Sequence, residues 1–274
     1  MELQDFITIA LKEDIGEKDI TSEIFLSDRQ NCEAAIIAKQ PQVICGISVA
    51  CEVFRNYDPD INFKIMTKDS HTVTKGAVLA KIHGKARNIL AAERVALNLL
   101  SHLSGIATKT REFVKAIKPY KTRIIDTRKT IPGLRILQKY AVRTGGGYNH
   151  RMQMDEMILV KDNHLKIIGG YDKLNLKNSG LRTKGYKIEM EVESLEDFKK
   201  ALKLWPDIIM LDNMSIPDIK KAVRLRKGDK PKLEASGGIT LKNVKEFAAT
   251  GVDFISIGEL THSVKATDIS LEIV

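Results

Sequence analysis

The chain has 274 residues, 43% hydrophobic and 29% charged, enough to bury one large core or a large and a small one. Its 44 basic residues exceed 35 acidic ones, and the net charge of +9 favours an anionic partner: nucleic acid, an anionic membrane or a highly charged small substrate. No run of about 18 apolar residues occurs, and the acids in "MELQDFITIALKEDIG" are unlike a signal peptide, so we expect a cytoplasmic protein without a membrane span.

The cysteines and aromatic residues narrow further the classes of protein and of partner that the sequence allows. The three cysteines, Cys32, Cys45 and Cys51, are odd in number and never spaced as CxxC, which argues against a disulfide framework or a zinc site. Aromatic residues are 5% of the chain, and Trp205 stands apart from the basic motifs. Because proteins that bind single-stranded nucleic acid stack bases on aromatic side chains, this composition disfavours nucleic acid as the partner.

The first part of the chain predicts helices and an antiparallel sheet. Residues 5–14 have apolar side chains at helical spacing and are followed by the turn residues of "DIGEKDIT". Apolar or alternating runs broken by proline and glycine predict strands, and we expect them at 32–40, 42–48 and 72–84. A helix is expected at 46–58.

A long amphipathic helix is predicted at 88–117. Its apolar residues form one face: Ala92, Val95, Ala96, Leu99, Leu100 and Leu103. Arg94 falls on the opposite face, where it is either a solvated helix residue or free to reach another site.

Beyond Arg123 short apolar runs alternate with helical segments. The predicted strands are 123–127, 157–162, 187–193, 207–213, 232–238 and 253–258. This alternation is typical of a parallel sheet, and the polar residue that ends each run indicates a barrel with its chemistry at the carboxyl ends of the strands. Residues 167–185 are the one candidate for a long loop.

The segment "DTRKTIPGLR", residues 126–135, is rich in cations and contains Pro132 and Gly133. Since proline and glycine disrupt a helix, we expect a rigid loop. A rigid cationic loop predicts an anionic ligand.

Carboxylates at the strand ends suggest a site for cations. In "KIEMEVE" the pleat puts Glu189, Glu191 and Glu193 on one face, either to hold Mg²⁺ or the basic side chains, or as the solvated face of an edge strand. Asp212 follows four apolar residues and is either an active-site side chain or a helix cap.

Glycines after the last strands suggest a phosphate site. Ser236, Gly237 and Gly238 stand before a predicted helix at 241–251, and Gly258 follows the last barrel strand. The triple glycine of "RTGGGYNHRM" lacks the GxGxxG order of a dinucleotide fold, which disfavours a Rossmann oxidoreductase.

Taken together, the motifs resemble those of the quinolinate phosphoribosyltransferases, also called nicotinate-nucleotide pyrophosphorylases (carboxylating). The motifs stand in that family's order, from about Ala10 to the C-terminus: "EDIGEKDIT", "AERVALNLLSHLSGIAT", "DTRKTIPGLR", "GGGYNHRM", "ILVKDNH", "EVE", "LDNM", "EASGGI" and "LTHS". The resemblance implies an N-terminal α/β sandwich, residues 1–105 completed by 267–274, and an open α/β barrel of the type II phosphoribosyltransferases, residues 106–266.

The same resemblance implies a reaction and a site. Quinolinate and phosphoribosyl pyrophosphate would give nicotinate mononucleotide, pyrophosphate and carbon dioxide, with Mg²⁺, in a homodimer or larger assembly. The carried-over substrate-binding residues are Arg94, reaching from the other subunit, Thr127, Arg128, Lys129, His150, Arg151 and Lys161 for quinolinate, Glu191 and Asp212 for the ribose and Mg²⁺, and Ser236, Gly237, Gly238, Ile257, Gly258 and Glu259 for the 5-phosphate.

Four of these residues are expected to act in the chemistry. Glu191 and Asp212 would stabilise an oxocarbenium-like transition state, and Lys129 or Lys161 would assist protonation of the carbon that loses carbon dioxide. The chain departs from the family at residues 153–156 and at Glu259, where a small residue is common, and this puts the shape of the phosphate site in doubt.

Two other functions compete with this hypothesis. The first is the paralogue found with molybdate transport genes, against which "NHRM" and "ILVKDNH" speak. The second is a basic nucleic-acid-binding protein, which would present a contiguous cationic outer face and bind more weakly as salt rises. Many cations here fall at predicted strand ends and loops beside carboxylates, which favours the enzyme.

Overall fold

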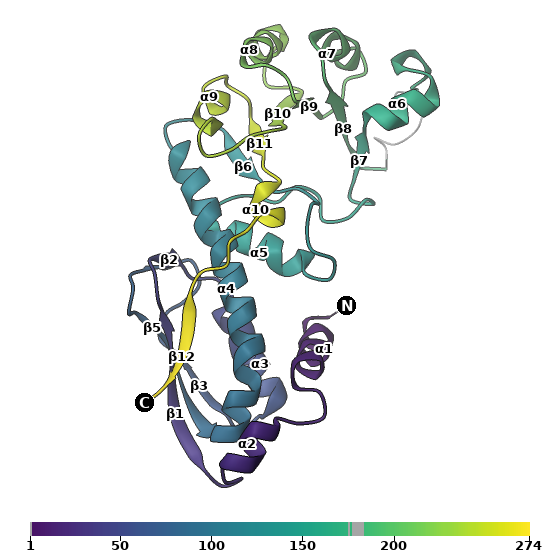
Figure 1. Ribbon diagram of the computed structural model, residues 1–274. Helices are drawn as coiled ribbons and strands as arrows, with labels where there is room; N and C mark the ends of the chain where they lie inside the picture. The colour runs from purple at the N-terminus through teal and green to yellow at the C-terminus, as the bar shows by residue number, and fades with distance from the viewer. Residues whose placement is uncertain (1, 175, 177–183) are drawn as a thin grey trace. The chain divides into compact units, whose positions relative to one another are not determined.

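The computed structural model describes residues 2–174, 176 and 184–274 of the chain. It divides into two units (Figure 1): the first comprises Met1–Arg111, Ile131–Gly146 and Ser263–Val274, and the second Glu112–Thr130 and Gly147–His262. No helix in the described ranges is long and apolar enough to cross a membrane.

The first unit is built on a four-stranded antiparallel sheet in the order β12, β1, β5, β3. The strands are β1 (Asn31–Ala38), β3 (Asn62–Ile65), β5 (Val78–Lys85) and β12 (Ile269–Ile273), and β2 (Gln42–Val43) pairs separately with β4 (Thr72–Val73). The helices are α1 (Leu3–Ile15), α2 (Ile20–Phe25), α3 (Ile47–Tyr57), most of α4 (Ala86–Ala116) and α5 (Arg135–Gly145).

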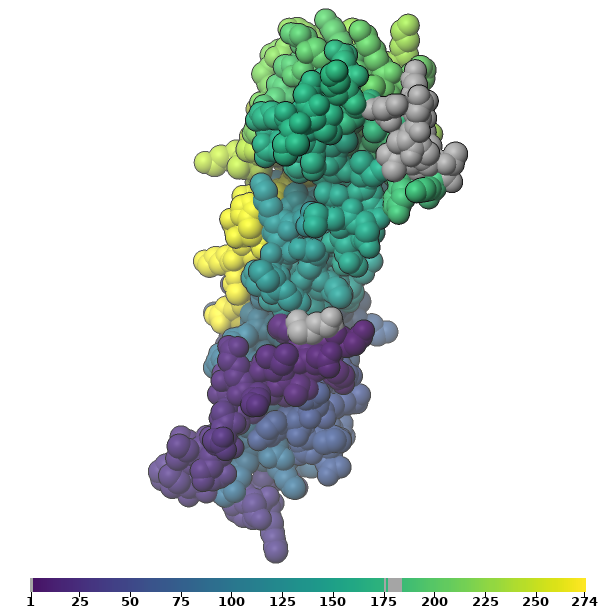
Figure 2. Space-filling view, turned by 90° about the vertical axis from the view of Figure 1, so that its right-hand side faces the viewer, coloured from purple at the N-terminus to yellow at the C-terminus, as the bar shows by residue number. Residues whose placement is uncertain are grey.

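Burial in this unit follows the apolar face predicted for the long helix. The six predicted α4 residues are at most 8% exposed, and Leu100 and Leu103 are completely buried. Helices α1 and α2 lie at the surface of the unit (Figure 2), where Ile24 and Phe25 of α2 are 66% and 79% exposed. The N-terminal unit therefore has a well-formed core and leaves apolar side chains of α2 in contact with solvent.

Two local predictions for this unit are wrong. The strand expected at 42–48 stops at Val43, because the backbone N–H groups of Gly46 and Ile47 donate to the carboxylate of Asp69 and Gly46 has a φ of 97°, so that α3 starts at once. Part of the expected turn is instead α2, which begins because Asp19 accepts a hydrogen bond from the Ser22 N–H at 3.1 Å.

The second unit is a six-stranded parallel sheet in the order β6, β11, β10, β9, β8, β7. Its strands are β6 (Arg123–Ile125), β7 (Met157–Val160), β8 (Lys187–Val192), β9 (Ile208–Asp212), β10 (Lys232–Ser236) and β11 (Phe254–Ser256). In the described chain β6 and β7 are the unpaired ends of the sheet, so the barrel is open and the predicted fold class is confirmed.

Short helices connect these strands: α6 (Asp162–Ile168), a 3₁₀ helix (Tyr171–Lys173), α7 (Leu195–Leu202), α8 (Ile216–Leu225), α9 (Val244–Ala248) and α10 (Glu259–His262). Helices α7 and α8 lie along the outside of the sheet (Figure 1). Of the loop expected at 167–185, residues 175 and 177–183 lie outside the described residues. Strand β8 is flanked by β7 and β9, so the alternative of an edge strand for "KIEMEVE" is wrong.

Candidate active site

A cavity of about 670 Å³ lies at the carboxyl ends of the barrel strands, within the second unit. Every site residue predicted from the sequence lines it except Arg94: Thr127, Arg128, Lys129, His150, Arg151, Lys161, Glu191, Asp212, Ser236, Gly237, Gly238, Ile257, Gly258 and Glu259. Arg94 is on α4 in the other unit, with its side chain 62% exposed and 3.8 Å from Glu93.

One wall of the cavity presents two arginines with unused hydrogen-bond donors. The Nε atoms of Arg128 and Arg151 are buried and have no acceptor among the described residues. Arg151 is held in place because its Nη1 donates to the Met157 carbonyl at 2.8 Å. Burial, and then the nearby Arg128, lower the pKa of Arg151. Two like charges held close together, each with a buried Nε that has no acceptor in the described residues, fit an anionic ligand.

The two lysines of this wall differ in their surroundings. Lys161 Nζ lies 2.5 Å from Glu191 Oε2, so its charge is already paired with a carboxylate. Lys129 is exposed, and its Nζ has no hydrogen-bond or ion-pair partner within the described ranges. Its backbone is fixed instead, because its N–H donates to Thr127 Oγ1 at 3.1 Å and its carbonyl accepts from Thr261 Oγ1 at 2.7 Å.

Asp126, the first residue of the cationic loop motif, holds the neighbouring segment in place. It is completely buried, and its Oδ1 accepts the His150 N–H at 2.9 Å. Its own N–H donates to the Tyr148 carbonyl at 3.1 Å, and the Tyr148 N–H donates to the Ile124 carbonyl at 2.9 Å. These bonds extend β6 sideways, so that His150 and Arg151 lie beside Arg128.

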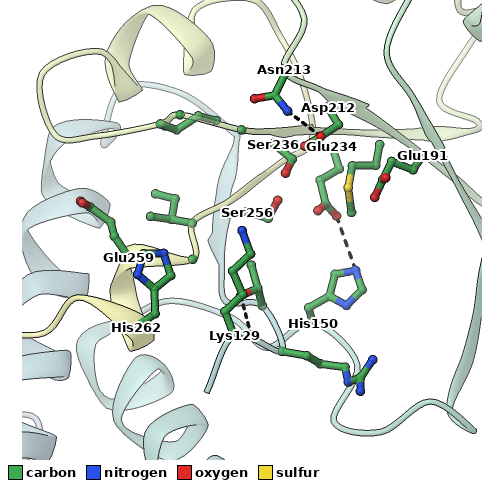
Figure 3. A pocket seen from close by; sticks show the side chains of 18 of the residues that line it. Lys129, His150, Glu191, Asp212, Asn213, Glu234, Ser236, Ser256, Glu259 and His262 are labelled. Atoms are coloured by element: carbon green, nitrogen blue, oxygen red, sulfur yellow. Dashed lines mark hydrogen bonds and ion pairs between the residues drawn. The ribbon is translucent and has the colours of Figure 1, made fainter. Parts of the chain in front are cut away.

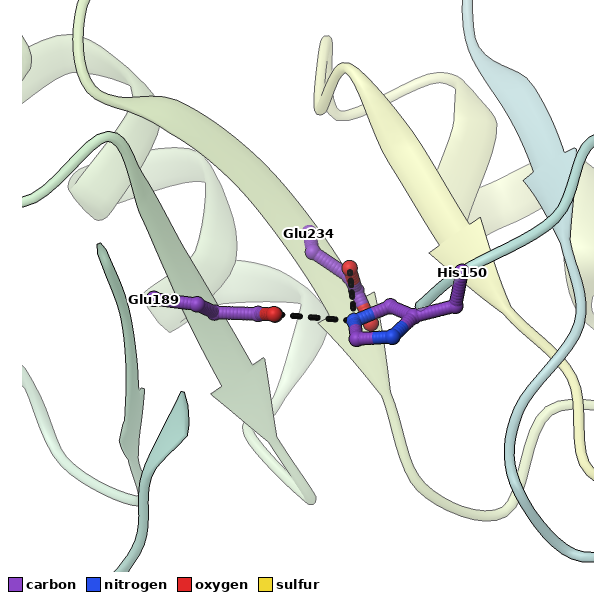
Figure 4. A group of neighbouring side chains, drawn as sticks. All are labelled: His150, Glu189 and Glu234. Carbon is purple, nitrogen blue, oxygen red and sulfur yellow. Dashed lines mark hydrogen bonds and ion pairs between the residues drawn. The ribbon is translucent and has the colours of Figure 1, made fainter. Parts of the chain in front are cut away.

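The base of the cavity is acidic and buried. His150 Nε2 lies 2.8 Å from Glu189 Oε2 and 3.9 Å from Glu234 Oε2 (Figure 4). Neither glutamate is exposed to solvent. Burial raises the pKa of Glu189 to about 7 and, with the Glu189 carboxylate nearby, raises that of Glu234 as well. The carboxyl groups of Glu189 and Glu234 can therefore keep protons at a pH where an exposed glutamate has lost its own.

The opposite wall is formed by carboxylates and backbone (Figure 3). Asp212 ends β9 and accepts a hydrogen bond from Asn213 Nδ2 at 2.7 Å. The Asn213 N–H donates to the Ser236 carbonyl at 2.9 Å, and Asn213 has a φ of 52°. Glu191 and Asp212 thus both face the cavity, as carboxylates that suit a hard cation such as Mg²⁺.

Two glycines of this wall stand at positions where a side chain would come too close to neighbouring atoms. Gly237 has a φ of 95°, and a Cβ there would lie 2.2 Å from Asn213 Oδ1. At Gly258 a Cβ would lie 3.0 Å from Lys129 Cδ, so that glycine leaves room for the lysine. The helix expected at 241–251 is only Val244–Ala248, so the backbone of the loop itself, rather than a long helix dipole, lines this wall.

Several lining residues were not among the predicted ones: Asn213, Glu234, Ser256 and His262. A signal for Glu234 was present, because it stands two residues before Ser236 on the same strand and so shares its face. Glu193 was expected beside Glu189 and Glu191, but it lies beyond the end of β8 and is exposed. Glu259 lines the cavity on the side away from Glu191 (Figure 3).

Comparison with known proteins agrees with this geometry. The quinolinate phosphoribosyl transferase N-terminal domain matches residues 19–104 and the C-terminal domain residues 106–272. A probable nicotinate-nucleotide pyrophosphorylase [carboxylating] of Bacillus subtilis (strain 168) is 41% identical over 273 residues, covering 100% of this chain and 94% of its own. Quinolinate phosphoribosyltransferase [decarboxylating] 1 of Nicotiana glauca is 40% identical over 99% of this chain and 82% of its own.

Solved structures give the same result. The nicotinate-nucleotide pyrophosphorylase of Francisella tularensis superposes with a TM-score of 0.93 at 39% identity, covering 99% of this chain and 96% of its own. Human nicotinic acid phosphoribosyltransferase, at 11% identity and a TM-score of 0.64 over 100% of this chain and 74% of its own, shares the fold alone. The two matched domains span nearly the whole chain, which therefore belongs to the quinolinate phosphoribosyl transferase family.

Proposed function

We propose that the protein transfers the phosphoribosyl group of phosphoribosyl pyrophosphate to quinolinate and removes a carboxylate, giving nicotinate mononucleotide, pyrophosphate and carbon dioxide for NAD biosynthesis. The observation that carries this proposal is the pair of buried, acceptor-free Nε atoms of Arg128 and Arg151 beside Lys129. Such donors match a planar dicarboxylate, because a guanidinium binds a carboxylate through two parallel hydrogen bonds.

The cavity also accounts for the second substrate. A phosphorylated ribose would lie along the opposite wall, with its 5-phosphate against the backbone of residues 236–238 and 257–259. Glycines allow that backbone to approach a phosphate closely. Relatives named for the same reaction at about 40% identity over nearly the full chain support this assignment.

The reaction begins with attack of the pyridine nitrogen on the anomeric carbon of the ribose. The carbon–oxygen bond to pyrophosphate breaks as the carbon–nitrogen bond forms, and positive charge develops on the sugar. Glu191 and Asp212 stabilise that charge electrostatically. Holding both reactants in one orientation supplies much of the remaining rate enhancement.

Loss of carbon dioxide follows from the charge of the product of this transfer. The electrons of the broken carbon–carbon bond collapse toward the positive pyridinium nitrogen, and the resulting carbon takes up a proton. Lys129 assists that protonation in our proposal, since its ammonium has no partner in the described chain, whereas Lys161 is paired with Glu191. Lys161 would then act mainly by orienting Glu191 and the acceptor.

A magnesium ion fits the acidic wall of the cavity. Glu191 and Asp212 offer carboxylate oxygens, the ligands that Mg²⁺ prefers, and the pyrophosphate of the substrate would supply others. Bound there, the ion would neutralise charge on the leaving pyrophosphate. The two carboxylates would bind the ion mainly through the substrate that it accompanies.

We further propose a homodimer in which Arg94 reaches the partner's cavity. Support comes from its 62% exposed side chain, whose ion pair in the described residues is with the adjacent Glu93 at 3.8 Å, and from the exposed apolar side chains of α2. When Arg94→Ala and Lys129→Ala subunits are mixed, the hybrid dimers should regain about half of their active sites if each cavity takes the two residues from different chains. If the subunits exchange and no activity is recovered, Arg94 does not act in the cavity of the partner subunit.

The decisive experiment is an assay of the purified protein with phosphoribosyl pyrophosphate and Mg²⁺, measuring quinolinate loss and nicotinate mononucleotide formation, with nicotinate as the competing acceptor. Product from quinolinate alone supports the proposal. No product from either acceptor in folded protein would favour the paralogue of unknown substrate, with residues 153–156 as the first place to look.

Location in the cytoplasm stays a prediction.

A further inference from the structure

The base of the cavity holds two glutamates to which the proposed reaction gives no role. His150, Glu189 and Glu234 come from three separate segments, and one ligand atom of each lies within 4.8 Å of the others (Figure 4). Glu234 is completely buried, and neither of its carboxylate oxygens has a hydrogen-bond partner among the described residues. A buried carboxyl group that makes no hydrogen bond in the described part of the chain and lines a substrate cavity calls for a physical explanation.

The hydrogen bonds of His150 determine where its proton lies. Its Nδ1 accepts the backbone N–H of Arg151 at 2.9 Å, so Nδ1 is not protonated. The proton is therefore on Nε2, which donates to Glu189 Oε2 at 2.8 Å. His150 is a neutral imidazole that links the Glu189 carboxylate to the backbone of Arg151.

The two glutamates differ in how their charge is compensated. Arg151 and Lys161 lie close enough to Glu189 to favour its ionised form. Within the part of the chain that the structure describes, the groups acting on Glu234 are the Glu189 carboxylate, the His150 ring and the Ser256 hydroxyl, with no lysine or arginine among them. Two carboxylates this close and this deeply buried do not both ionise, so the proton belongs on Glu234.

A divalent cation is the alternative occupant of this cluster. It would have to displace the Nε2 proton that His150 donates to Glu189, and it would lie close to the fixed charges of Arg151 and Lys161. Both effects oppose the ion, whereas a single proton satisfies the geometry without either.

We propose that Glu234 favours acceptor binding by staying a neutral carboxylic acid, which leaves Glu189 as the one negative charge beside His150 and Arg151, where the acceptor's carboxylates would bind. This inference rests on the proposed function, because the acceptor is taken to be quinolinate. Ionised Glu234 would add a second negative charge directly below a dianionic substrate. The KM for quinolinate therefore rises with pH as Glu234 loses its proton, while the KM for phosphoribosyl pyrophosphate changes little.

Three variants separate this role from a purely structural one. Glu234→Gln keeps a neutral polar group that never ionises, Glu234→Leu removes the polar group at similar size, and Glu246→Gln on the exposed part of α9 is the control. We expect the KM for quinolinate at neutral pH to stay within about threefold of the wild type in both Glu234→Gln and Glu234→Leu, because both residues are neutral and Glu234 has no hydrogen bond to lose among the described residues. The alkaline rise of KM should vanish in Glu234→Gln and persist in Glu246→Gln.

Two results of the kinetics would overturn the proposal. One is a rise of the KM for quinolinate at alkaline pH that is the same in Glu234→Gln as in the wild type. The other is a rise in both substrates' KM values in equal proportion, which would mean general distortion of the cavity. Equilibrium dialysis with Mn²⁺ alone tests the alternative of a bound cation. One ion bound per chain in the wild type and none in Glu234→Leu would show that a metal ion, and not a proton, occupies the cluster.

A readout independent of turnover keeps the network testable if quinolinate is not the substrate. Long-range ¹⁵N–¹H spectra of the imidazoles, with His150→Gln identifying the signal, should show protonated Nε2 and unprotonated Nδ1 for His150. An imidazolium at neutral pH would overturn the inference. If the wild type leaves quinolinate unchanged but the spectra show the neutral tautomer, the proposed function fails and the arrangement of protons stands.

Discussion

The two walls of the cavity bind by different physical means. The wall formed by Arg128, Lys129 and Arg151 uses long charged side chains, two of which keep buried donors unpaired. The wall of residues 236–238 and 257–259 uses backbone, and at Gly237 it excludes a side chain altogether. The first wall is suited to a planar anion and the second to a group that approaches the backbone closely, so under our proposal substitutions on the two walls should affect different substrates.

Removing the unpaired ammonium should have the largest effect. We expect Lys129→Ala to lower kcat about 100-fold or more, because the carbon that loses carbon dioxide is then protonated without a positioned acid. Lys245→Ala, an exposed lysine on α9, is the control. Steady-state kinetics and circular dichroism check the outcome, and normal turnover would remove Lys129 from the chemistry.

Changing the shape of a guanidinium should act on the acceptor alone. Arg128→Lys keeps the charge and loses the planar pair of donors, so the KM for quinolinate should rise about 30-fold. The KM for phosphoribosyl pyrophosphate should stay within about twofold if the walls are independent. Equal rises for both substrates would show that the comparison between the walls is wrong.

A side chain at Gly237 should act on the other substrate. Gly237→Ala places a Cβ 2.2 Å from Asn213 Oδ1 at a φ of 95°, so the KM for phosphoribosyl pyrophosphate should rise about tenfold. Gly228→Ala has a φ of 71° and no atom within 4 Å of the new Cβ, and it isolates the cost of the backbone angle. If both variants lose only stability in urea unfolding, the backbone wall has no role in binding.

The smallest effect should be on stability as a function of pH. The pKa of Glu234 is raised in the folded protein, so the folded state holds that proton more tightly than the unfolded chain. The stabilisation is complete below the ordinary value of 4.5 and is lost as pH rises through the raised pKa. Glu234→Gln cannot ionise, so its unfolding free energy relative to wild type should increase with pH; parallel curves would contradict this.

The sequence predicted the charged wall better than the base of the cavity. Arg128 was identifiable because cations gathered in a rigid loop at a strand end have few structural uses, whereas Arg151 was assigned to the site through the family resemblance. Glu234 was not identified, although it shares the face of Ser236 on β10, because a single glutamate in an apolar run does not show which side chain lies opposite it. Only the order of strands, with β10 between β9 and β11, brings it beneath His150.

The same limit applies to the fold. The six barrel strands followed from alternating apolar runs, since each run is long and ends in polar residues. The early end of β2 could not be predicted from such a run. It depends on Asp69, more than twenty residues away in the chain, whose carboxylate accepts hydrogen bonds from two backbone N–H groups. Local patterns predict elements, and distant hydrogen bonds decide where they stop.

The pairing of β12 with β1 has a consequence for biogenesis. Ile269–Ile273 completes the edge of a sheet whose other strands are translated before the whole barrel unit. Until β12 emerges from the ribosome, β1 presents an open strand edge to other nascent chains. The first unit to be synthesised is therefore the last to be finished, and during that interval a chaperone would find its target on the outer edge of β1.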